Sequence, residues 1–365
     1  MTNNIFFSVI VCVFNAAKYF SRGISCLSGQ HFQAFEVILV DDGSTDETPS
    51  LCDLTAEGDS RFKVVHQQNA GPGPARNKGM EQAVGRYLCF FDIDDIVRCD
   101  WLEILYKRIV ENEPQLLIYG YREISEKNKT ITEVAFDELY FQTNEELRAG
   151  YLPHLSGLRC NNGFVWNKVY ERDFILSNDL RFSCCKIQQD ELFNLAVYKK
   201  TDRVRVVAEV LYDYYIYEKG NIRSTFIPDR TDNFCKIRES FLDLYQCWQL
   251  DDDRFLRYVH ERFIKSLLFN CNRNLSGRAR LDYFHSLVKM DAVQASVRFI
   301  ARMDPRSPGH DLLFDCYCSA IRKQAYYTML ALQIISDSIA GLKNRIRPVV
   351  HRIKGHDWSY QESKV

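Results

Sequence analysis

The stretch YLCFFDIDD, residues 87–95, joins a run of apolar and aromatic residues directly to a cluster of carboxylates. Asp92, Asp94 and Asp95 fall within four positions. Carboxylates this close repel one another, and each prefers water to an apolar neighbourhood. A bound cation would offset both effects. The stretch therefore predicts a site that receives positive charge.

Other polar residues follow apolar runs in the same way, so a larger site is expected. Phe14 and Asn15 end the first run, Asp42 ends the second, and Arg76 follows a Gly/Pro-rich stretch before the fourth. Mg²⁺ or Mn²⁺ takes one or two protein carboxylates together with phosphate oxygens. An Arg at the start of a helix binds further phosphate oxygens, and an aromatic ring can stack on a base. The set predicts a site for a metal-bound nucleoside diphosphate.

A structural interpretation competes with this one, because a single Asp at a strand end often caps the next helix. Ligand-type residues at three separate strand ends, with an Arg in the loop between two of them, favour the binding site.

These residues need a framework that brings strand ends together. The first 125 residues alternate between continuous apolar runs, typical of strands buried on both faces, and helical segments. We expect strands at 6–14, 35–43, 62–67, 87–94 and 116–124, and helices at 16–30, 45–57 and 74–85, the last opened by Pro74. This order predicts an α/β fold with a mostly parallel sheet, in which ligands bind at the carboxyl ends of the strands.

The rest of the chain has two further parts. Residues 126–225 have a mixed pattern that includes a long strand-like run, and beyond them only helical periodicity remains. We therefore expect a domain at 1–225, with a nucleotide-binding half at 1–125 and a second half at 126–225. An α-helical C-terminal region is expected at 226–365.

The composition excludes some classes of protein and partner. Hydrophobic residues make up 46% and charged residues 26% of the 365 residues, and the net charge is −1. This balance gives no field that would attract nucleic acid. The 13 cysteines show no C-x-x-C spacing, so we expect reduced thiols and a cytosolic chain. We expect neither a signal peptide nor a membrane-spanning helix.

The sequence resembles the glycosyltransferase family 2 enzymes with the GT-A fold. The resemblance covers residues 5–225 and runs through five blocks in the family's order: SVIVCVFNAAKYF, FEVILVDDGSTDET, NAGPGPARNKGMEQAVGRYLCFFDIDD, VWNKVYERDFI and QQDELFNLAVY. It implies a GT-A type nucleotide-sugar-binding domain whose second half binds the acceptor. The implied activity moves a sugar from a nucleoside-diphosphate sugar, a UDP-sugar before others, to a hydroxyl of a glycan or polyprenyl-linked acceptor in cell-surface polysaccharide synthesis.

The resemblance also implies roles on the donor side. The residues that it places beside the donor nucleotide are Phe14, Asn15, Asp42, Arg76 and Asp92. Phe14 would stack on the base, Asp42 would bond the edge of the base, and Asp92 would lie near the ribose. Asp94, the second carboxylate of a D-x-D pattern, would bind Mn²⁺ or Mg²⁺.

Asp190, in QQDE, matches the position of the family's catalytic base. The implied mechanism is inverting: Asp190 deprotonates an acceptor hydroxyl, which attacks the anomeric carbon in line as the nucleoside diphosphate leaves. A positioned base contributes ~10²–10⁴-fold to the rate, and the metal stabilises the charge on the departing diphosphate. On the acceptor side we expect Trp166, Lys168 and Glu191, with a place in the core as the competing interpretation for Trp166.

Some positions depart from the family's pattern. Cys12 stands where Pro is usual, and Gln189 stands where Glu is frequent before the base. In YDYYIYEKGNIRS, Tyr215 stands about where an Arg is usual, and Arg223 is a candidate replacement. Contacts from this segment to the diphosphate therefore stay open.

Three other functions are possible for a chain of this kind. A sugar nucleotidyltransferase or a dinucleotide dehydrogenase needs a Gly-rich signature directly after the first strand, but NAAKYF contains no Gly. The remaining alternative is a catalytically inactive family member that acts as a binding or assembly partner. The carboxylates Asp42, Asp92, Asp94 and Asp190 favour the enzyme.

Residues 338–356, SIAGLKNRIRPVVHRIKGH, hold five Lys or Arg and no acidic residue. Apolar residues recur there at three- and four-residue steps, a pattern typical of a helix that lies on an anionic membrane surface. Pro348 would kink that helix, and packing on the helical region is the competing interpretation. We expect a cytoplasmic protein, and we hypothesise peripheral association with the inner face of the cell membrane.

Overall fold

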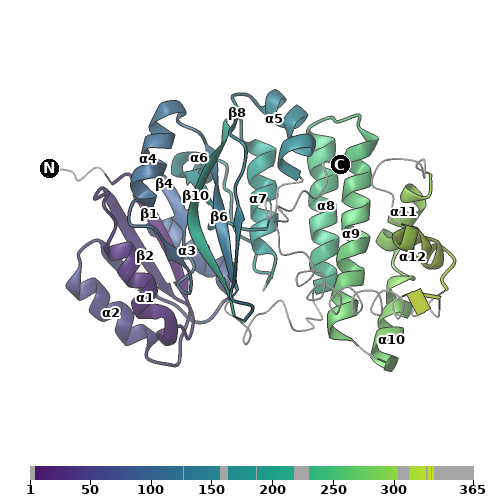
Figure 1. Cartoon of the computed structure of the whole chain (residues 1–365), viewed down its shortest axis with the longest axis horizontal. Helices are drawn as coiled ribbons and strands as arrows, with labels where there is room; N and C mark the ends of the chain where they lie inside the picture. Colours follow the sequence, from purple (N-terminus) through teal and green to yellow (C-terminus); the bar gives the residue numbers. More distant parts are fainter. Residues whose placement is uncertain are drawn as a thin grey trace, which may run out of the picture. The chain divides into compact units, whose positions relative to one another are not determined.

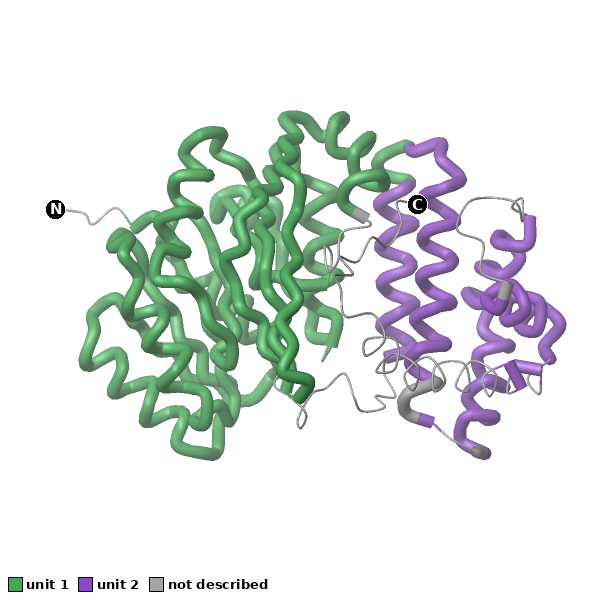
Figure 2. Tube along the Cα trace, in the orientation of Figure 1, with its two compact units in different colours: residues 1–221, 246–249 green, residues 222–245, 250–365 purple. Residues whose placement is uncertain are grey.

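A computed structural model describes residues 5–125, 127–156, 163–185, 187–217, 230–275, 277–302, 312–325, 328–329 and 331–332. The chain forms two compact units (Figure 2). Unit 1 comprises Met1–Asn221 with Gln246–Gln249, and unit 2 comprises Ile222–Tyr245 with Leu250–Val365. Unit 1 is α/β and contains all the candidate site residues, whereas the described elements of unit 2 are helices.

The first four strands of unit 1 form a parallel sheet. They are β1 (Phe7–Val13), β2 (Phe35–Asp41), β3 (Phe62–His66) and β4 (Tyr87–Phe90), in the spatial order β3-β2-β1-β4. Every residue of β2 is buried, and β1 is buried almost throughout. This confirms the sequence prediction, because a strand covered on both faces needs a continuous apolar run.

The helices between these strands lie close to their predicted positions. They are α1 (Ala17–Ser28), α2 (Thr48–Gly58) and α3 (Pro72–Gln82). Helix α3 begins at Pro72 and not, as predicted, at Pro74. Gly71 precedes it at φ 92°, a left-handed conformation that Gly adopts readily, and Pro72 then takes the favoured first helical position.

The second half of the sheet is not a simple continuation of the parallel strands. Strand β9 (Lys168–Glu171) lies antiparallel between β4 and β6 (Leu116–Ser125), so the predicted fifth strand is present but is not the neighbour of β4. Strand β10 (Val204–Ile216) runs parallel to β6, and the two lie side by side in Figure 1. The sheet is therefore mixed, with its parallel pairs in β1–β4 and in β6 with β10.

Shorter elements complete unit 1. They are β5 (Ile96–Val97), α4 (Trp101–Asn112), β7 (Thr130–Val134), β8 (Leu139–Phe141), α5 (Asn144–Gly150), a π-helical turn at Tyr151–Ser156, α6 (Arg172–Ser177) and α7 (Gln189–Lys200). The β5 strand pairs with β10 through Val97 and Tyr212. Because β5 follows the carboxylate cluster directly, this pairing brings the cluster beside β10.

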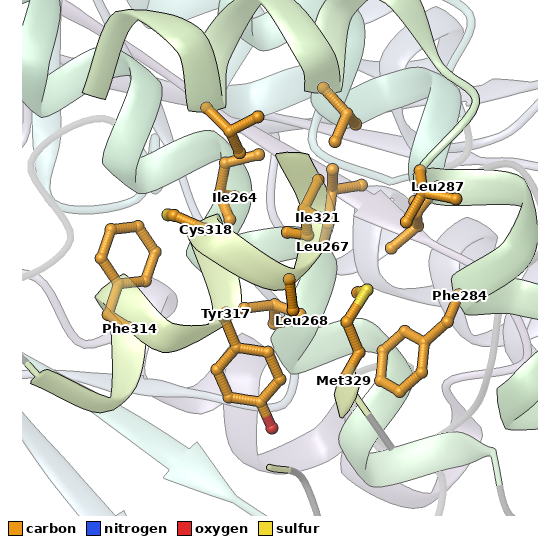
Figure 3. Packing of buried hydrophobic residues seen from close by; sticks show 14 of the residues in the cluster. Ile264, Leu267, Leu268, Phe284, Leu287, Phe314, Tyr317, Cys318, Ile321 and Met329 are labelled. Carbon is orange, nitrogen blue, oxygen red and sulfur yellow. The ribbon is translucent and has the colours of Figure 1, made fainter. Parts of the chain in front are cut away.

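Unit 2 has its own apolar core. Its described helices are α8 (Arg230–Cys247), α9 (Asp253–Asn274), α10 (Gly277–Leu287), α11 (Asp291–Ile300) and α12 (Leu312–Arg322). Figure 3 shows side chains from α9, α10 and α12 pointing into one interior, among them Leu267, Phe284 and Ile321, each 0–1% exposed. No helix within the described ranges is long and apolar enough to cross a membrane. The predicted amphipathic tail, 338–356, lies outside the described residues.

Candidate active site

Arg76 connects the candidate base to the carboxylate cluster. Its side chain, only 9% exposed, donates from Nη1 to Asp190 Oδ1 at 2.8 Å and from Nη2 to Asp92 Oδ1 at 3.4 Å. Burial by itself would lower the pKa of Arg76, but Asp190 and Asp92 raise it overall. Arg76 is therefore a permanent cation that joins helix α3, the turn after β4 and helix α7.

Asp92 lies in the turn that follows β4. The turn is tight, because the Asp95 backbone N donates to Asp92 O at 3.0 Å. Although 38% of its side-chain surface is exposed, the surrounding protein displaces much of its water, and this desolvation raises the pKa of Asp92 to about 6. Repulsion from Asp94 and Asp190 contributes to this raised pKa, and Arg76 opposes it. The carboxylates thus repel one another, as their spacing in the sequence predicted.

Asp94 and Asp95 have different environments. Asp95 is 1% exposed and accepts hydrogen bonds from Tyr212 Oη at 2.9 Å and from the Tyr215 backbone N at 2.8 Å. Burial, helped by Asp92 and Asp94, raises the pKa of Asp95 well above its ordinary value. The Asp94 carboxylate, in contrast, accepts a hydrogen bond only from its own backbone among the described residues, and burial raises its pKa. Asp95 therefore anchors the turn to β10, while the Asp94 carboxylate remains available to a ligand.

The carboxylates of this turn suit a divalent cation only if other ligands complete its coordination. Within the described ranges, no group of three or more His, Cys, Asp or Glu residues could hold a metal ion by itself. Asp94 could supply one carboxylate, two positions after Asp92. Mg²⁺ and Mn²⁺ bind through one or two carboxylates when phosphate oxygens and water complete the coordination. The residues fit a cation that is bound together with a diphosphate.

Asp42 holds the loop that leads into α3. The side chain is 4% exposed, and its two oxygens accept from Gln67 Nε2 at 2.7 Å, Ala70 N at 2.9 Å and Gly71 N at 2.8 Å. If the base of the sugar-donor nucleotide also contacted Asp42, it would share the carboxylate with these three hydrogen-bond donors. The structure thus gives Asp42 a loop-supporting role that the sequence did not reveal.

Phe14 and Asn15 stand at the end of β1. Phe14 is 51% exposed, which leaves its ring accessible for stacking on a base. Asn15 adopts a left-handed conformation at φ 49°, and its Oδ1 accepts from the Thr45 backbone N at 2.8 Å. Its own backbone N donates to Ser44 Oγ at 2.9 Å. Asn15 therefore ties the end of β1 to the loop after β2, beside the exposed ring.

Asp190 lies in the first turn of α7, and the segment before it is fixed to α3. Asn77 makes a reciprocal pair with Phe182, donating from Nδ2 to Phe182 O at 2.9 Å and accepting at Oδ1 from Phe182 N at 2.8 Å. A Cβ added to Gly73 would lie 2.2 Å from Ser183 O, so only a Gly allows this approach. Helix α3 thus carries Arg76 and also sets the position of the chain that leads to Asp190.

The three expected acceptor-side residues are buried. Trp166 is 2% exposed and stacks on Tyr212 with ring centroids 4.5 Å apart. Lys168 is 0% exposed, and its Nζ donates to Phe164 O at 2.6 Å. Glu191 is 4% exposed. In this structure their burial leaves none of them accessible to an acceptor, and for Trp166 it supports the competing interpretation as core.

The structure shows the surroundings of two positions that depart from the family's pattern, Cys12 and Tyr215. Burial raises the pKa of the Cys12 thiol to about 12, so this residue adds no charge to the site. Above the ring of Tyr215 lies the guanidinium of Arg22, with Cζ 4.4 Å from the ring centroid. Arg223, the candidate replacement for the missing Arg, lies outside the described residues.

Sequence reasoning missed the groups that position the candidate site. They are Arg22 of α1, Asn77 of α3, Tyr212 of β10, and Tyr217, which directly follows β10. Asn77 follows Arg76 directly, and the aromatic density of YDYYIY was visible, so both carried a weak signal. Arg22 carried none, because an Arg on an amphipathic helix is ordinarily a solvated surface residue.

Residues 8–170 match the model of a known protein family, described as "Glycosyl transferase family 2". Among curated proteins, the chain is 33% identical over 215 residues to EpsH of Bacillus subtilis (strain 168), which is provisionally named a glycosyltransferase. That alignment covers 58% of this chain and 60% of EpsH, so the chain spans about three fifths of this relative.

Among solved structures, the chain is similar to S. aureus TarS 1-349, crystallised in complex with UDP-GlcNAc. The TM-score is 0.71 at 20% identity, and the match covers 91% of this chain and 92% of that chain. A mannosyltransferase from Pyrobaculum calidifontis, in complex with GDP-Man and Mn2+, matches with a TM-score of 0.50 at 14% identity over 90% of this chain and 86% of that one. At these identities the likeness concerns the fold, and it confirms the expected GT-A type architecture with a helical C-terminal region.

Proposed function

We propose that the chain, whose residues 8–170 match the model of glycosyl transferase family 2, transfers a sugar from a nucleoside-diphosphate sugar to a hydroxyl of a glycan or lipid-linked acceptor. The observation that carries the proposal is the contact of Arg76 with both Asp92 and Asp190. It brings the candidate base to the edge of the sheet where the turn with Asp94 also lies.

The proposed reaction is a direct displacement with inversion. Arg76 holds Oδ1 of Asp190, while Oδ2 accepts no hydrogen bond from the described residues. Asp190 Oδ2 takes the proton of the acceptor hydroxyl as that oxygen forms its bond to the anomeric carbon. The bond between the anomeric carbon and the diphosphate breaks, and the nucleoside diphosphate leaves with the electron pair. Arg76 orients the base through its hydrogen bond to Oδ1.

A divalent cation belongs to this proposal, because the candidate site has an excess of carboxylates. Among the described residues, the guanidinium groups of Arg22 and Arg76 interact with Asp92, Asp94 and Asp190. A diphosphate would add further negative charge, so Mn²⁺ or Mg²⁺ at Asp94 would offset the repulsion. When bound, such an ion stabilises the charge that develops on a leaving diphosphate. The solved complex of the P. calidifontis mannosyltransferase with GDP-Man and Mn2+ supports this assignment by fold alone.

For the base of the donor we propose uracil. The exposed ring of Phe14, the loop held by Asn15 and the Asp42 carboxylate lie at the ends of β1 and β2, where a base can stack and be recognised at its edge. TarS, which shares the fold, was crystallised with UDP-GlcNAc. Residues 126–225 would then form the acceptor-binding half.

The proposal also covers the acceptor and the location of the protein. We propose a role in cell-surface polysaccharide synthesis, on a glycan or polyprenyl-linked acceptor, by a protein at the inner face of the cell membrane. The support is the basic, amphipathic sequence of 338–356, because a lipid-linked acceptor is reached most easily from the membrane surface.

A thermal-shift screen tests the function directly. The full chain is melted with UDP- and GDP-sugars in Mn²⁺ and, separately, in EDTA. A ligand at 100 times its dissociation constant adds about 2.7 kcal/mol to the apparent stability, so a Mn²⁺-dependent rise in Tm with a UDP-sugar is expected, and Asp94→Ala should lose it. The same sugar is then incubated with candidate acceptors. Release of UDP identifies the enzyme, binding without release identifies the inactive alternative, and no shift with any nucleotide sugar contradicts both.

A further inference from the structure

We propose that Arg22, from helix α1, is a positioning residue that clamps the turn carrying Asp92 and Asp94 against strand β10 and so prepares it for the metal-bound diphosphate. This role rests on the proposed function. It is carried by hydrogen bonds, by a ring contact and by a close backbone approach that sequence reasoning did not anticipate.

Arg22 and Tyr217 converge on one backbone carbonyl. Arg22 Nη2 donates to Asp94 O and also to Tyr217 Oη. Tyr217 Oη in turn donates to Asp94 O at 2.8 Å. Arg22 and Tyr217 thus bind Asp94 at its backbone carbonyl. Among the described residues, the Asp94 carboxylate accepts a hydrogen bond only from its own backbone N–H. A residue that fixes the backbone of a metal ligand without occupying its carboxylate is suited to positioning that ligand.

The contact with Arg22 is built into the packing of α1 on the turn. A Cβ added to Gly23 would lie 2.4 Å from the backbone O of Ile93, so α1 and the turn meet at van der Waals distance beside Arg22. The guanidinium of Arg22 also lies over the ring of Tyr215, with Cζ 4.4 Å from the ring centroid. Arg22 therefore connects α1, the turn and β10 at one point.

Tyr212 of β10 bonds the two ends of the turn. Tyr212 Oη accepts from the Asp92 backbone N at 3.1 Å and donates to Asp95 Oδ2 at 2.9 Å. These bonds fix the beginning and the end of the turn but not Asp94 between them. Arg22 and Tyr217 supply the missing attachment at Asp94.

A clamped turn binds a metal-bound diphosphate more tightly than a loose one, because less conformational freedom is lost on binding. The effect should therefore appear in metal-dependent nucleotide affinity. A general loss of structure would instead lower the melting temperature of the free protein.

The test measures the dissociation constant of UDP for the full chain, in Mn²⁺ and in EDTA. GDP is measured in the same way as the alternative nucleotide. Arg22→Gln should weaken Mn²⁺-dependent binding at least tenfold, about 1.4 kcal/mol. Arg22→Lys should recover only part of the loss, because an ammonium keeps the charge but lacks the fixed fork of guanidinium donors. Tyr217→Phe should weaken binding as well. Arg98→Gln is the matched control, since Arg98 pairs with Asp100 on the exposed surface shortly after the turn.

The outcomes are separable. If the wild type and Arg22→Gln bind UDP equally well in Mn²⁺, the clamp has no role, although the proposed function stands. If the wild type shows no Mn²⁺-dependent binding of either nucleotide, the proposed function fails and the clamp with it. If Arg22→Gln does not fold, Tyr217→Phe decides alone, because it removes only one hydroxyl: unchanged binding overturns the proposal, and weakened binding with an unchanged Tm supports it.

Discussion

At the scale of single residues, the three carboxylates of the D-x-D-D turn have separate roles. Asp95 is buried and bonded to β10, so it is part of the framework. Asp92 contacts Arg76, and its desolvation raises its pKa to about 6. The Asp94 carboxylate is the member of the three that is left to a ligand. The cluster is therefore tolerated because protein groups stabilise part of it and, in our proposal, a cation stabilises the remainder.

The role of Asp190 leads to the first prediction. Asp190→Asn keeps the shape of the side chain but removes its ability to accept a proton, so sugar transfer should fall by roughly 10²–10⁴-fold. Binding of the donor should persist, because Arg76 keeps its contact with Asp92. Transfer is measured as UDP release, and binding as the Mn²⁺-dependent thermal shift.

Asp173→Asn is a matched control for this experiment. Asp173 also lies in the first turn of a helix, α6, but its side chain is 87% exposed and forms an ion pair with the neighbouring Arg172. Near-normal transfer by Asp190→Asn would mean that another group is the base.

At the scale of elements, the contact between α3 and the segment before α7 decides whether Arg76 and Asp190 meet. Gly73→Ala would bring a methyl group to 2.2 Å from Ser183 O. Overpacking of this kind costs typically about 1–3 kcal/mol, and the shifted segment should separate Asp190 from Arg76. We expect a lower urea midpoint and slower transfer.

Gly58→Ala provides the comparison for Gly73. Gly58 ends helix α2, and a Cβ there meets nothing within 4 Å. Ala is the better helix former by up to about 1 kcal/mol, so this variant should be as stable as the wild type or slightly more stable. If both variants behave alike, the close approach at Gly73 is not what fixes the segment.

A second feature at this scale joins β2, β3 and α2. His66 Nδ1 lies 2.9 Å from Asp41 Oδ2, and His66 Nε2 lies 3.0 Å from Asp53 Oδ1. The contacts with Asp41 and Asp53 raise the pKa of His66. Although burial acts in the opposite direction, hydrogen bonds from Ser44 and His66 lower the pKa of Asp41. The folded protein therefore favours a protonated His66 between the carboxyl groups of Asp41 and Asp53.

This arrangement predicts a pH dependence of stability. Because the folded pKa of His66 is raised, its contribution is complete below the ordinary value of about 6.5 and is lost as the pH rises through the raised value. His66 is 44% exposed, so the contribution should be about 1 kcal/mol or less. Urea unfolding of the wild type and of His66→Gln should differ most at pH 6 and converge at pH 8.5.

His31→Gln is the control for the pH experiment. His31 is 59% exposed and lies 4.0 Å from Glu103, so its replacement should change stability little at either pH. A His66→Gln deficit that stays constant from pH 6 to pH 8.5 would show that packing, and not the charge of His66, links these elements.

At the scale of the whole molecule, the candidate chemistry belongs to unit 1, while unit 2 has a separate core. The described part of that core ends with Met329 and Leu332. The basic tail, 338–356, begins after these residues, so the tail can be removed without deleting any described core residue. This allows the proposed membrane contact to be tested apart from the fold.

The prediction concerns vesicle binding. Each Lys or Arg near an anionic surface contributes roughly 1 kcal/mol, so the full chain should co-sediment with anionic vesicles at low salt, and a version ending at Asp337 should not. Neutral vesicles and high salt serve as controls, because both remove the electrostatic attraction. Equal sedimentation of the two versions, or of neither, removes the tail from the proposed function.

The sequence by itself determined the strands of the parallel half and the residues at their ends. A strand buried on both faces requires a continuous apolar run, and this requirement is local, so it can be read from neighbouring residues in β1, β2 and β4. The candidate residues Phe14, Asp42 and Asp94 followed from their places beside those runs. The roles of Asp95 and Asp42 could not be predicted in this way, because both depend on hydrogen-bond donors that come from other segments.

Only the tertiary structure decided which distant segments meet. The insertion of β9 between β4 and β6, the contact of Arg76 with Asp190, and the approach of Arg22 to Asp94 all join residues far apart in the chain. Such contacts depend on the sheet order and on how helices pack on it. No local periodicity records them, because the residues that meet belong to different elements whose patterns are set separately by burial. The candidate ligands could thus be read from the sequence, whereas the groups that position them could be found only in the fold.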